Sequence, residues 1–184
     1  ESKAHAFKMA EGILEATKNL NNIDLYYKSS FDKANRSKSD GFRGVGMHDG
    51  LNILAAVKKE FGLKILTDVH EATQCESVAV VADVLQVPAF LCRQTDLLEA
   101  AAKTGKTVNV KKGQFMEPAG MRNVLTKTDP AKTWLTERGT TFGYGDLVVD
   151  FRGLVIMKRF GVPVIFDATH SVQQTIRTES GTKT

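Results

Sequence analysis

The feature that most constrains this chain is a regular alternation of amphipathic and short apolar segments. Apolar residues recur at three- and four-residue steps near the N-terminus and again over 51–61, which predicts helices with one apolar side. Short runs rich in Val, Ile and Leu lie between such segments, as buried strands do. The predicted strands are 23–27, 64–69, 84–87, 107–112, 133–137 and 163–168, and the predicted helices are 7–20, 51–61, 73–80, 95–104, 118–125 and 147–160.

Strict alternation of strands and helices indicates parallel strands joined by helical crossovers, so the predicted class is α/β, either a closed barrel or an open doubly wound sheet. Polar residues at or just beyond the end of six different strands favour the barrel, because in a (β/α)8 TIM barrel those ends meet at one mouth. These residues are Lys28, Asp68, Gln86, Lys111, Arg138 and His170.

The expected fold is therefore a single (β/α)8 catalytic domain over residues 1–184 that is incomplete at both ends. Only six strands are predicted, so a first strand would precede Glu1 and a last unit would follow Thr184. Residues 171–184 show no clear period, and we expect residues 174–184 to form a flexible loop at the barrel mouth.

Composition is that of a globular domain. The chain has 184 residues, of which 42% are hydrophobic and 25% charged. A net charge of +4 suggests nucleic acid, but the basic residues are spread along the chain, so no nucleic-acid partner is expected. Cys75 and Cys92 lack metal-ligand spacing, and no apolar run approaches ~20 residues. We expect reduced thiols, a cytoplasmic location and no membrane contact.

A polar loop, KSSFDKANRS at 28–37, follows the first predicted strand. Lys28, Lys33 and Arg36 stand in it among hydroxyls and an amide. Charged donors suit carboxylate and phosphate oxygens, and a guanidinium can bind such groups through two hydrogen bonds. The alternative is a solvated charged turn.

Two cations stand at the ends of later strands. Lys111 ends an apolar strand, where a lysine is costly unless an anion or a carboxylate accompanies it, so a buried salt bridge is the alternative to an anion site. Arg138 is expected to face the mouth, where it could bind a phosphate through two hydrogen bonds or form a buried salt bridge, while Glu137 points outward or pairs with a lysine. The backbone over 86–90 could present N–H groups to an oxyanion, and Arg93 follows it.

Histidines complete the candidate chemistry. Asp68 and His70 alternate with apolar residues and should share a face, as an acid and a base or as a hydrogen-bonded pair. His170 is either a satisfied structural group or a metal ligand at the mouth. A nucleophile elbow, a Walker loop and a dinucleotide glycine fingerprint are all absent from the sequence.

These residues occur in blocks that resemble the 3-deoxy-D-manno-octulosonate 8-phosphate synthase family along nearly the whole chain. The blocks are KSSFDKANRS, KILTDVHE, QVPAFLCRQTDL, NVKKGQF, TERGTTFGYGDLVVD and PVIFDATHSVQ. The resemblance implies an enzyme of lipopolysaccharide biosynthesis that condenses phosphoenolpyruvate with arabinose 5-phosphate and releases phosphate. The ANRS run favours this family over the related 3-deoxy-arabino-heptulosonate 7-phosphate synthases.

The resemblance also implies roles for individual residues. Lys28, Ser30 and Lys33 would surround the carboxylate and reacting carbons of phosphoenolpyruvate. The phosphate of arabinose 5-phosphate would be held by Asn35, Arg36 and Ser37. The phosphate of phosphoenolpyruvate would be held by Lys111, Arg138 and the backbone of Ala89, with Gln86, Arg93 and Gln114 nearby.

His170 corresponds to the histidine ligand of family members that use a divalent metal such as Zn, Fe or Mn. Its usual companions, a cysteine and an acidic pair, would lie before Glu1 and beyond Thr184. The motifs FLCRQ, KKGQF and DATHSVQ favour the metal-dependent branch. Family members without metal carry asparagine in place of the cysteine. The family implies no organic cofactor and a homotetramer.

Two other functions compete with this interpretation. A Schiff-base aldolase built on Lys111 would also place a lysine at a barrel strand end. A non-catalytic barrel that binds a sugar phosphate would use the same cations without turnover.

Overall fold

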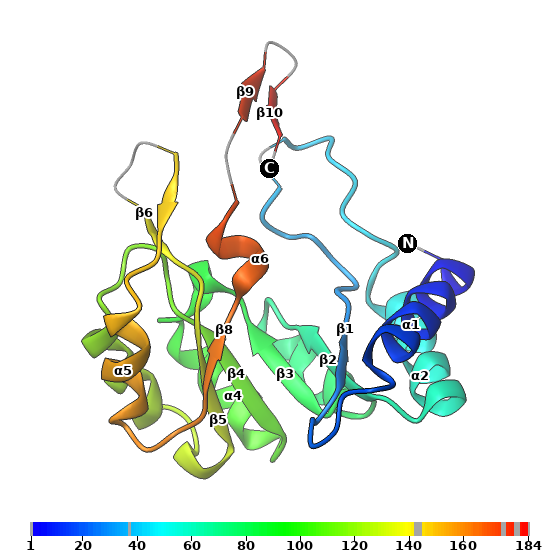
Figure 1. Cartoon of the computed structure of the whole chain (residues 1–184), viewed down its shortest axis with the longest axis horizontal. Coiled ribbons are helices and arrows are strands. Elements are labelled where there is room, and N and C mark those ends of the chain that lie inside the picture. The colour runs from blue at the N-terminus through cyan, green and yellow to red at the C-terminus, as the bar shows by residue number, and fades with distance from the viewer. Residues whose placement is uncertain (1, 37, 142–144, 174–175, 179–180, 184) are drawn as a thin grey trace.

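A parallel sheet of six strands forms the centre of the chain (Figure 1). The computed structural model describes residues 2–36, 38–141, 145–173, 176–178 and 181–183. The sheet order is β1-β2-β3-β4-β5-β8, and every neighbouring pair is parallel. Its strands are β1 (Tyr26–Lys28), β2 (Lys64–Asp68), β3 (Val84–Val87), β4 (Thr107–Lys111), β5 (Thr133–Glu137) and β8 (Val164–Phe166).

The sequential strand order distinguishes this sheet from an open doubly wound one. A doubly wound sheet reverses its order at a switch point, whereas each strand here pairs with its predecessor in the sheet and the sheet curls as a half-barrel. The prediction of an α/β class with six parallel strands is thus confirmed. The predicted strands agree with the observed ones apart from their ends: β1 starts at Tyr26 rather than at Ile23.

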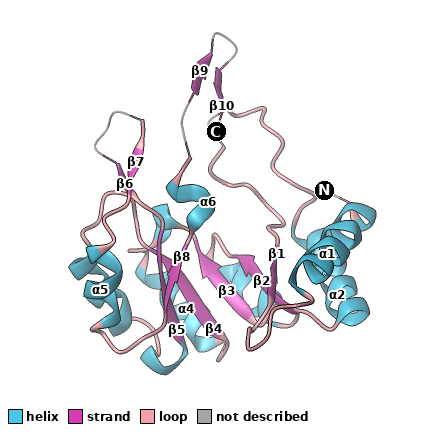
Figure 2. Ribbon diagram, in the orientation of Figure 1, coloured by secondary structure: helices cyan, strands magenta, loops and turns pink. Residues whose placement is uncertain are grey.

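Helices lie around the outside of the curled sheet (Figure 2). The helix α2 packs on β2, α4 on β3 and β4, and α5 on β5 and β8, so the helices cover the strands that they connect. The α-helices are α1 (Lys3–Thr17), α2 (Met47–Phe61), α3 (Cys75–Ala79), α4 (Thr95–Lys103), α5 (Arg152–Lys158) and α6 (Ala168–Ser171). The 3-10 helices are η1 (Ala72–Gln74), η2 (Ala89–Leu91), η3 (Pro118–Thr126) and η4 (Pro130–Lys132).

The two faces of the sheet differ because strand side chains alternate between them. Ile65, Leu85 and Val110 point toward the helices and belong to the main hydrophobic core. Leu66 and Val84 are buried but lie outside that core, on the concave face. Alternation places Asp68 and Lys111 on the concave face too, next to the ends of their strands.

Two predicted helices have a different structure. The helix predicted over 118–125 is the 3-10 helix η3, Pro118–Thr126. The helix predicted over 147–160 is shorter, since Leu147–Val148 is a strand, β7, that pairs antiparallel with β6 (Thr140–Thr141). The helical period therefore holds only from Arg152 to Lys158.

The C-terminal residues were expected to form a loop, and their described parts are instead two short antiparallel strands. These are β9 (Ile176–Thr178) and β10 (Gly181–Lys183). The rest of 174–184 lies outside the described residues.

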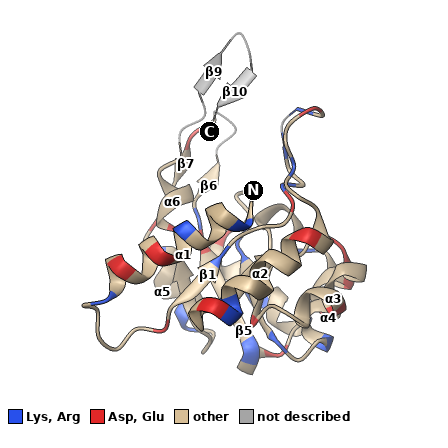
Figure 3. Ribbon diagram, turned by 90° about the vertical axis from the view of Figure 1, so that its right-hand side faces the viewer, with Lys and Arg blue, Asp and Glu red and all other residues tan. Residues whose placement is uncertain are grey.

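The outer helices carry charges of both signs (Figure 3). Helix α1 has Lys3 and Lys8 together with Glu11 and Glu15. Among the described residues, none of the helices is long and apolar enough to cross a membrane.

Candidate active site

A cavity of about 740 Å³, here called the strand-end cavity, opens at the carboxyl ends of the parallel strands. Thirteen residues that the sequence marked as candidates line it, from β1 through β8 and the loops that follow them. They are Lys28, Ser30, Lys33, Asn35, Arg36, Asp68, His70, Gln86, Ala89, Lys111, Gln114, Arg138 and His170. Segments far apart in the sequence therefore form one site.

Two candidate residues are not part of this cavity as described. Arg93 lines a separate hollow of about 510 Å³ beside Cys92 and Lys127, rather than the strand-end cavity. Ser37 lies outside the described residues.

One wall of the strand-end cavity is built on the carboxylate of Asp68. Its Oδ2 accepts a short hydrogen bond from Ser30 and lies 3.2 Å from Lys28 Nζ, and its Oδ1 accepts from Gln86 Nε2 at 2.6 Å. Burial raises the pKa of Asp68, but Lys28 and the hydrogen bonds from Ser30 and Gln86 outweigh it and leave that pKa below its usual value. The carboxylate is therefore ionised and fixes the lysine.

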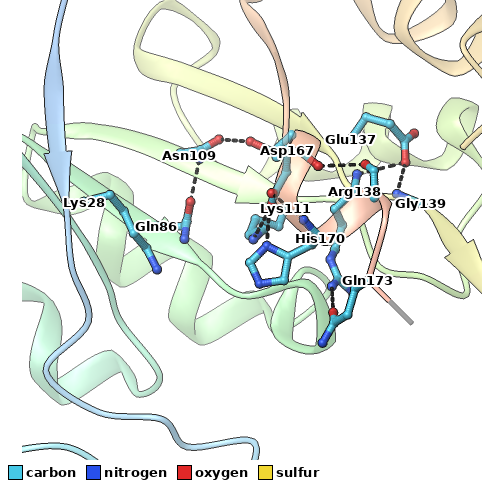
Figure 4. A network of polar contacts seen from close by, with 12 residues as sticks. Lys28, Gln86, Asn109, Lys111, Glu137, Arg138, Gly139, Asp167, His170 and Gln173 are labelled. Atoms are coloured by element: carbon cyan, nitrogen blue, oxygen red, sulfur yellow. Dashed lines mark hydrogen bonds and ion pairs between the residues drawn. The ribbon is translucent and has the colours of Figure 1, made fainter. Parts of the chain in front are cut away.

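The opposite wall is built on Asp167, which sequence reasoning missed. Asp167 Oδ2 lies 2.5 Å from Lys111 Nζ and 2.7 Å from His170 Nδ1 (Figure 4). Burial raises the pKa of Asp167, and the hydrogen bonds from His170 and Lys111 bring it well below its usual range. The motif DATH contained a signal, since an aspartate three residues before a histidine can cap the turn and reach its ring.

Arg138 enters the cavity because its neighbour Glu137 is held on the other side. Glu137 Oε1 accepts from the backbone N–H of Arg138 at 2.9 Å and of Gly139 at 2.7 Å, and it lies 3.4 Å from Lys112 Nζ. Pairing of Glu137 with a lysine is confirmed, and the side chain lies on the helix side of β5 beside Gly153 of α5, where it is 2% exposed. The guanidinium of Arg138 donates to Gln173 at 3.3 Å.

The polar loop after β1 is anchored through Phe31, which is 2% exposed. Gly44, at φ +129, and Gly50 both pack against it, and a Cβ at either would lie 2.4 Å from a Phe31 atom. Glycine is therefore required at these close approaches. The anchor directs Lys33 and Arg36 into the cavity, where Arg36 Nε also donates to the carbonyl of Phe42 at 3.1 Å.

Positive charge dominates the strand-end cavity. Its lining includes the cations Lys28, Lys33, Arg36, Lys38, Lys111 and Arg138. Burial lowers the pKa of Lys33, and Lys28, Arg36 and Lys111 lower it further. Burial also lowers the pKa of Lys111 and of Arg138, and the nearby carboxylates offset this lowering only in part. Such a group of desolvated cations suits multiply charged anions.

His70 behaves differently from the expected acid and base pair with Asp68. The described contacts join Asp68 to Ser30, Gln86 and Lys28, so the hydrogen-bonded pair is not formed. The ring packs edge-on against Phe31, and its buried Nδ1 has no hydrogen-bond partner. Burial lowers the pKa of His70, which keeps the imidazole neutral near pH 7.

The metal question rests on His170. Among the described residues there is no group of three or more His, Cys, Asp or Glu side chains that could hold a metal ion. The donation of Nδ1 to a carboxylate is nevertheless the usual support of a histidine that ligates through Nε2. Cys75 and Cys92 are buried free thiols, and burial raises the pKa of Cys75 to about 11, so neither is an activated nucleophile.

Comparisons with known proteins show the family to which the chain belongs. Residues 1–180 match the model of the DAHP synthetase I family. The chain is 58% identical over 177 residues to a 2-dehydro-3-deoxyphosphooctonate aldolase of Rickettsia rickettsii, a match that covers 95% of this chain and 64% of that protein. Proteins of the same name from Brucella anthropi and Rickettsia bellii are 57% and 59% identical over the same shares. The chain thus spans 64% of the length of these curated relatives.

Proposed function

The chain belongs to the DAHP synthetase I family, and from that premise we propose that it condenses phosphoenolpyruvate with D-arabinose 5-phosphate and water. The products are 3-deoxy-D-manno-octulosonate 8-phosphate and inorganic phosphate. The proposed setting is a cytoplasmic homotetramer in lipopolysaccharide biosynthesis, with a (β/α)8 barrel that the half-barrel sheet forms in part. The name of the relatives, 2-dehydro-3-deoxyphosphooctonate aldolase, supports this reaction.

One observation carries the proposal: six cations from three segments, residues 28–38, the end of β4 and the end of β5, line one cavity of about 740 Å³. Two anionic substrates repel each other in water, and a cationic site offsets that repulsion while holding the reacting carbons close. Carbon 3 of phosphoenolpyruvate attacks the aldehyde of the sugar, water adds at carbon 2, and phosphate leaves with cleavage of its carbon–oxygen bond.

The proposed residue roles are those that the family resemblance implies, and they are supported by the lining that most of these residues share. Lys111 and Arg138, at 9% and 7% exposure, are desolvated partners for the phosphate of phosphoenolpyruvate, with the Ala89 backbone beside them. Lys28, Ser30 and Lys33 face its carboxylate. Asn35 and Arg36 are the proposed partners of the sugar phosphate; Ser37, the third residue expected there, lies outside the described residues.

A divalent metal fits the site at His170, whose Nδ1 is held by Asp167. When bound there, such a metal would supply Lewis acidity that orients the aldehyde or activates the water. Its other ligands are not among the described residues.

The deciding experiment follows phosphate release and sugar formation with both substrates and a divalent metal present. Phosphoenolpyruvate that carries oxygen-18 in the bridging position should give labelled phosphate, because the carbon–oxygen bond breaks. Unlabelled phosphate would contradict the mechanism, and binding of both substrates without turnover would favour the non-catalytic barrel. Faster reaction with erythrose 4-phosphate than with arabinose 5-phosphate would favour the heptulosonate synthase.

Trapping with borohydride tests the Schiff-base alternative. That alternative has some support, because burial lowers the pKa of Lys111 and a less basic lysine is the better nucleophile. We expect no covalent adduct, since Lys111 is engaged by Asp167 at 2.5 Å as a charge partner. An adduct at Lys111 in the presence of substrate would overturn the mechanism.

Replacement of Arg36 by alanine tests the division of the cavity between two substrates. A charged hydrogen bond is worth about 1.5–3 kcal/mol, so Arg36→Ala should raise the KM for arabinose 5-phosphate roughly tenfold or more. The KM for phosphoenolpyruvate should change little. Steady-state kinetics with each substrate varied in turn measures both, and equal losses would contradict the assignment.

A further inference from the structure

Four polar side chains connect neighbouring strands beneath the strand-end cavity. Thr136 Oγ1 donates to Asn109 Oδ1 at 2.6 Å, Asn109 Nδ2 donates to Gln86 Oε1 at 2.9 Å, and Gln86 Nε2 donates to Asp68 Oδ1 at 2.6 Å. Asp68, Gln86 and Asn109 are direct register partners on β2, β3 and β4. We call Thr136, Asn109, Gln86 and Asp68 the four-strand network; Figure 4 shows its link between Asn109 and Gln86.

The two distant members have no direct access to substrate. Asn109 and Thr136 are each 2% exposed, and neither lines the strand-end cavity, whereas Gln86 and Asp68 do. A role for Asn109 and Thr136 must therefore act through the other two residues.

The network has one direction, since every hydrogen points toward Asp68. The ionised carboxylate of Asp68 can only accept, so Gln86 must turn its NH₂ to Asp68 and its oxygen to Asn109, and Asn109 must then turn its NH₂ to Gln86 and its oxygen to Thr136. If the Gln86 amide turned over, two donors would meet at Asn109 and two acceptors at Asp68. The hydroxyl of Thr136 completes this order by donating to the oxygen of Asn109, so it stabilises the orientation of an amide two strands away.

We propose that Asn109 and Thr136 are positioning residues that aim the Gln86 amide at Asp68 and so keep its carboxylate charged and in place to hold Lys28 and Ser30. This inference rests on the proposed function and adds residues to it. Lys28 and Ser30 lie where the carboxylate of phosphoenolpyruvate is expected, so a disturbed Asp68 would release the groups that bind this substrate.

The groups around Asp68 show why the hydrogen bond from Gln86 is needed to keep its carboxylate charged. The charged and titratable groups that face it are Lys28 from β1, Lys33 from the polar loop and His70 after β2, and the last is neutral near pH 7. Burial alone raises the pKa of Asp68, and the bond from Gln86 is among the interactions that lower it. Loss of that bond moves the titration of Asp68 to higher pH.

Two near-isosteric variants test the proposal. Asn109→Leu removes both hydrogen bonds of the amide, and Thr136→Val removes only the hydroxyl. Thr136→Ser keeps the hydroxyl and should restore wild-type behaviour. Thr67→Val is the matched control, because Thr67 is a fully buried threonine next to Asp68 whose hydroxyl has no hydrogen-bond partner.

The first readout is the pH titration of the Asp68 carboxyl carbon by NMR in the protein without substrate. For Asn109→Leu we expect the midpoint to move to higher pH by about one pH unit, from the worth of a hydrogen bond to a charged group. For Thr136→Val we expect a smaller shift of about 0.3 pH unit in the same direction, from the loss of cooperative strengthening. Thr136→Ser and Thr67→Val should leave the midpoint unchanged.

The second readout is the acid limb of kcat/KM for phosphoenolpyruvate, which should move with the midpoint while the value near pH 8 changes less. A merely structural role would lower activity at every pH and leave the Asp68 midpoint in place. An unmoved midpoint in both Asn109→Leu and Thr136→Val, or an equal shift in Thr67→Val, overturns the proposal.

Failure of the proposed function gives a different result. If the wild-type protein forms no product, the condensation is wrong, yet the NMR titration still decides whether Asn109 and Thr136 control Asp68. If the wild type is active and the midpoint does not move, the positioning role is wrong and the function stands.

Discussion

Lys111 and Lys112 are adjacent in sequence and lie in opposite environments. Lys111 ends β4 on the concave face, lines the strand-end cavity and meets Asp167 at 2.5 Å. Lys112 is 0% exposed, and its Nζ contacts Glu137 at 3.4 Å and Thr140 Oγ1 at 3.1 Å. Three backbone carbonyls, of Gly113, Met116 and Gly139, complete its surroundings.

The difference teaches how one kind of side chain serves two purposes. The protein satisfies every hydrogen of Lys112 itself, so that lysine joins the end of β4 to the segment after β5. Lys111 has one carboxylate partner and an open cavity on its other side, so it can still receive an anion. Stability and function should therefore separate between these two positions.

The largest effect should come from Lys112→Met. It leaves Glu137 as a buried charge without its cation, which costs about 3–5 kcal/mol in the free energy of unfolding. Urea denaturation followed by circular dichroism measures this loss.

A second change serves as its control. Glu137→Gln, added to Lys112→Met, removes the remaining charge but keeps an oxygen for the N–H groups of Arg138 and Gly139. The double variant should regain part of the lost stability. A double variant less stable than Lys112→Met would show that the charge of Glu137 is not the source of the loss.

Lys111→Met should show the opposite pattern. Its removal takes one desolvated donor from the anion site, which we expect to lower kcat/KM about 10²–10³-fold. The free energy of unfolding should change by less than for Lys112→Met, because the remaining partner, Asp167, keeps a bond from His170. Kinetics and urea denaturation on the same samples test the separation, and a loss of stability equal to that of Lys112→Met would contradict it.

Thr140→Val should have a smaller effect of the same kind as Lys112→Met. It removes one neutral acceptor from Lys112 while Glu137 and the carbonyls remain, so we expect a loss of about 1 kcal/mol in unfolding free energy. Activity should stay within about twofold. Thermal denaturation gives the first value, and a loss as large as that of Lys112→Met would show that the hydroxyl, and not the ion pair, satisfies the lysine.

The smallest and most gradual effect concerns alkaline pH. Burial lowers the pKa of Lys111, although Asp167 opposes it, so Lys111 loses its proton before an ordinary lysine does. Affinity for phosphoenolpyruvate should therefore fall as the pH rises through the lowered pKa of Lys111, which lies below the usual ~10.4. Between this pKa and that of the unfolded chain the unfolded state binds more protons, so the free energy of unfolding should increase with pH. In Lys111→Arg the affinity should be weaker but should no longer fall there, which calorimetric titration at several pH values measures.

Much of this contrast followed from local patterns. Alternation of apolar residues before Lys111 placed it at a strand end, and six such ends predicted one shared mouth. The polar loop at 28–37 was recognised because three cations stood close together in the sequence. These inferences rest on short-range periodicity and on a general rule for parallel strands.

Other parts depend on tertiary structure and were missed. Asp167 pairs with Lys111 from the N-cap of α6, more than fifty residues away, and no local pattern joins them. The network position of Asn109 depends on register between strands, which an apolar strand pattern does not determine. Leu147 and Val148 fit a helical period but pair with β6, a contact that a local period does not predict.

The positive lining of the strand-end cavity also bears on the rates at which molecules enter and leave. Six cations around one opening attract anions over about 10 Å at moderate ionic strength, so encounter should be fast in dilute buffer and slow markedly when salt is added. The same field acts on an anion that is released there. Inorganic phosphate would dissociate slowly and would compete with the next phosphorylated molecule for the site.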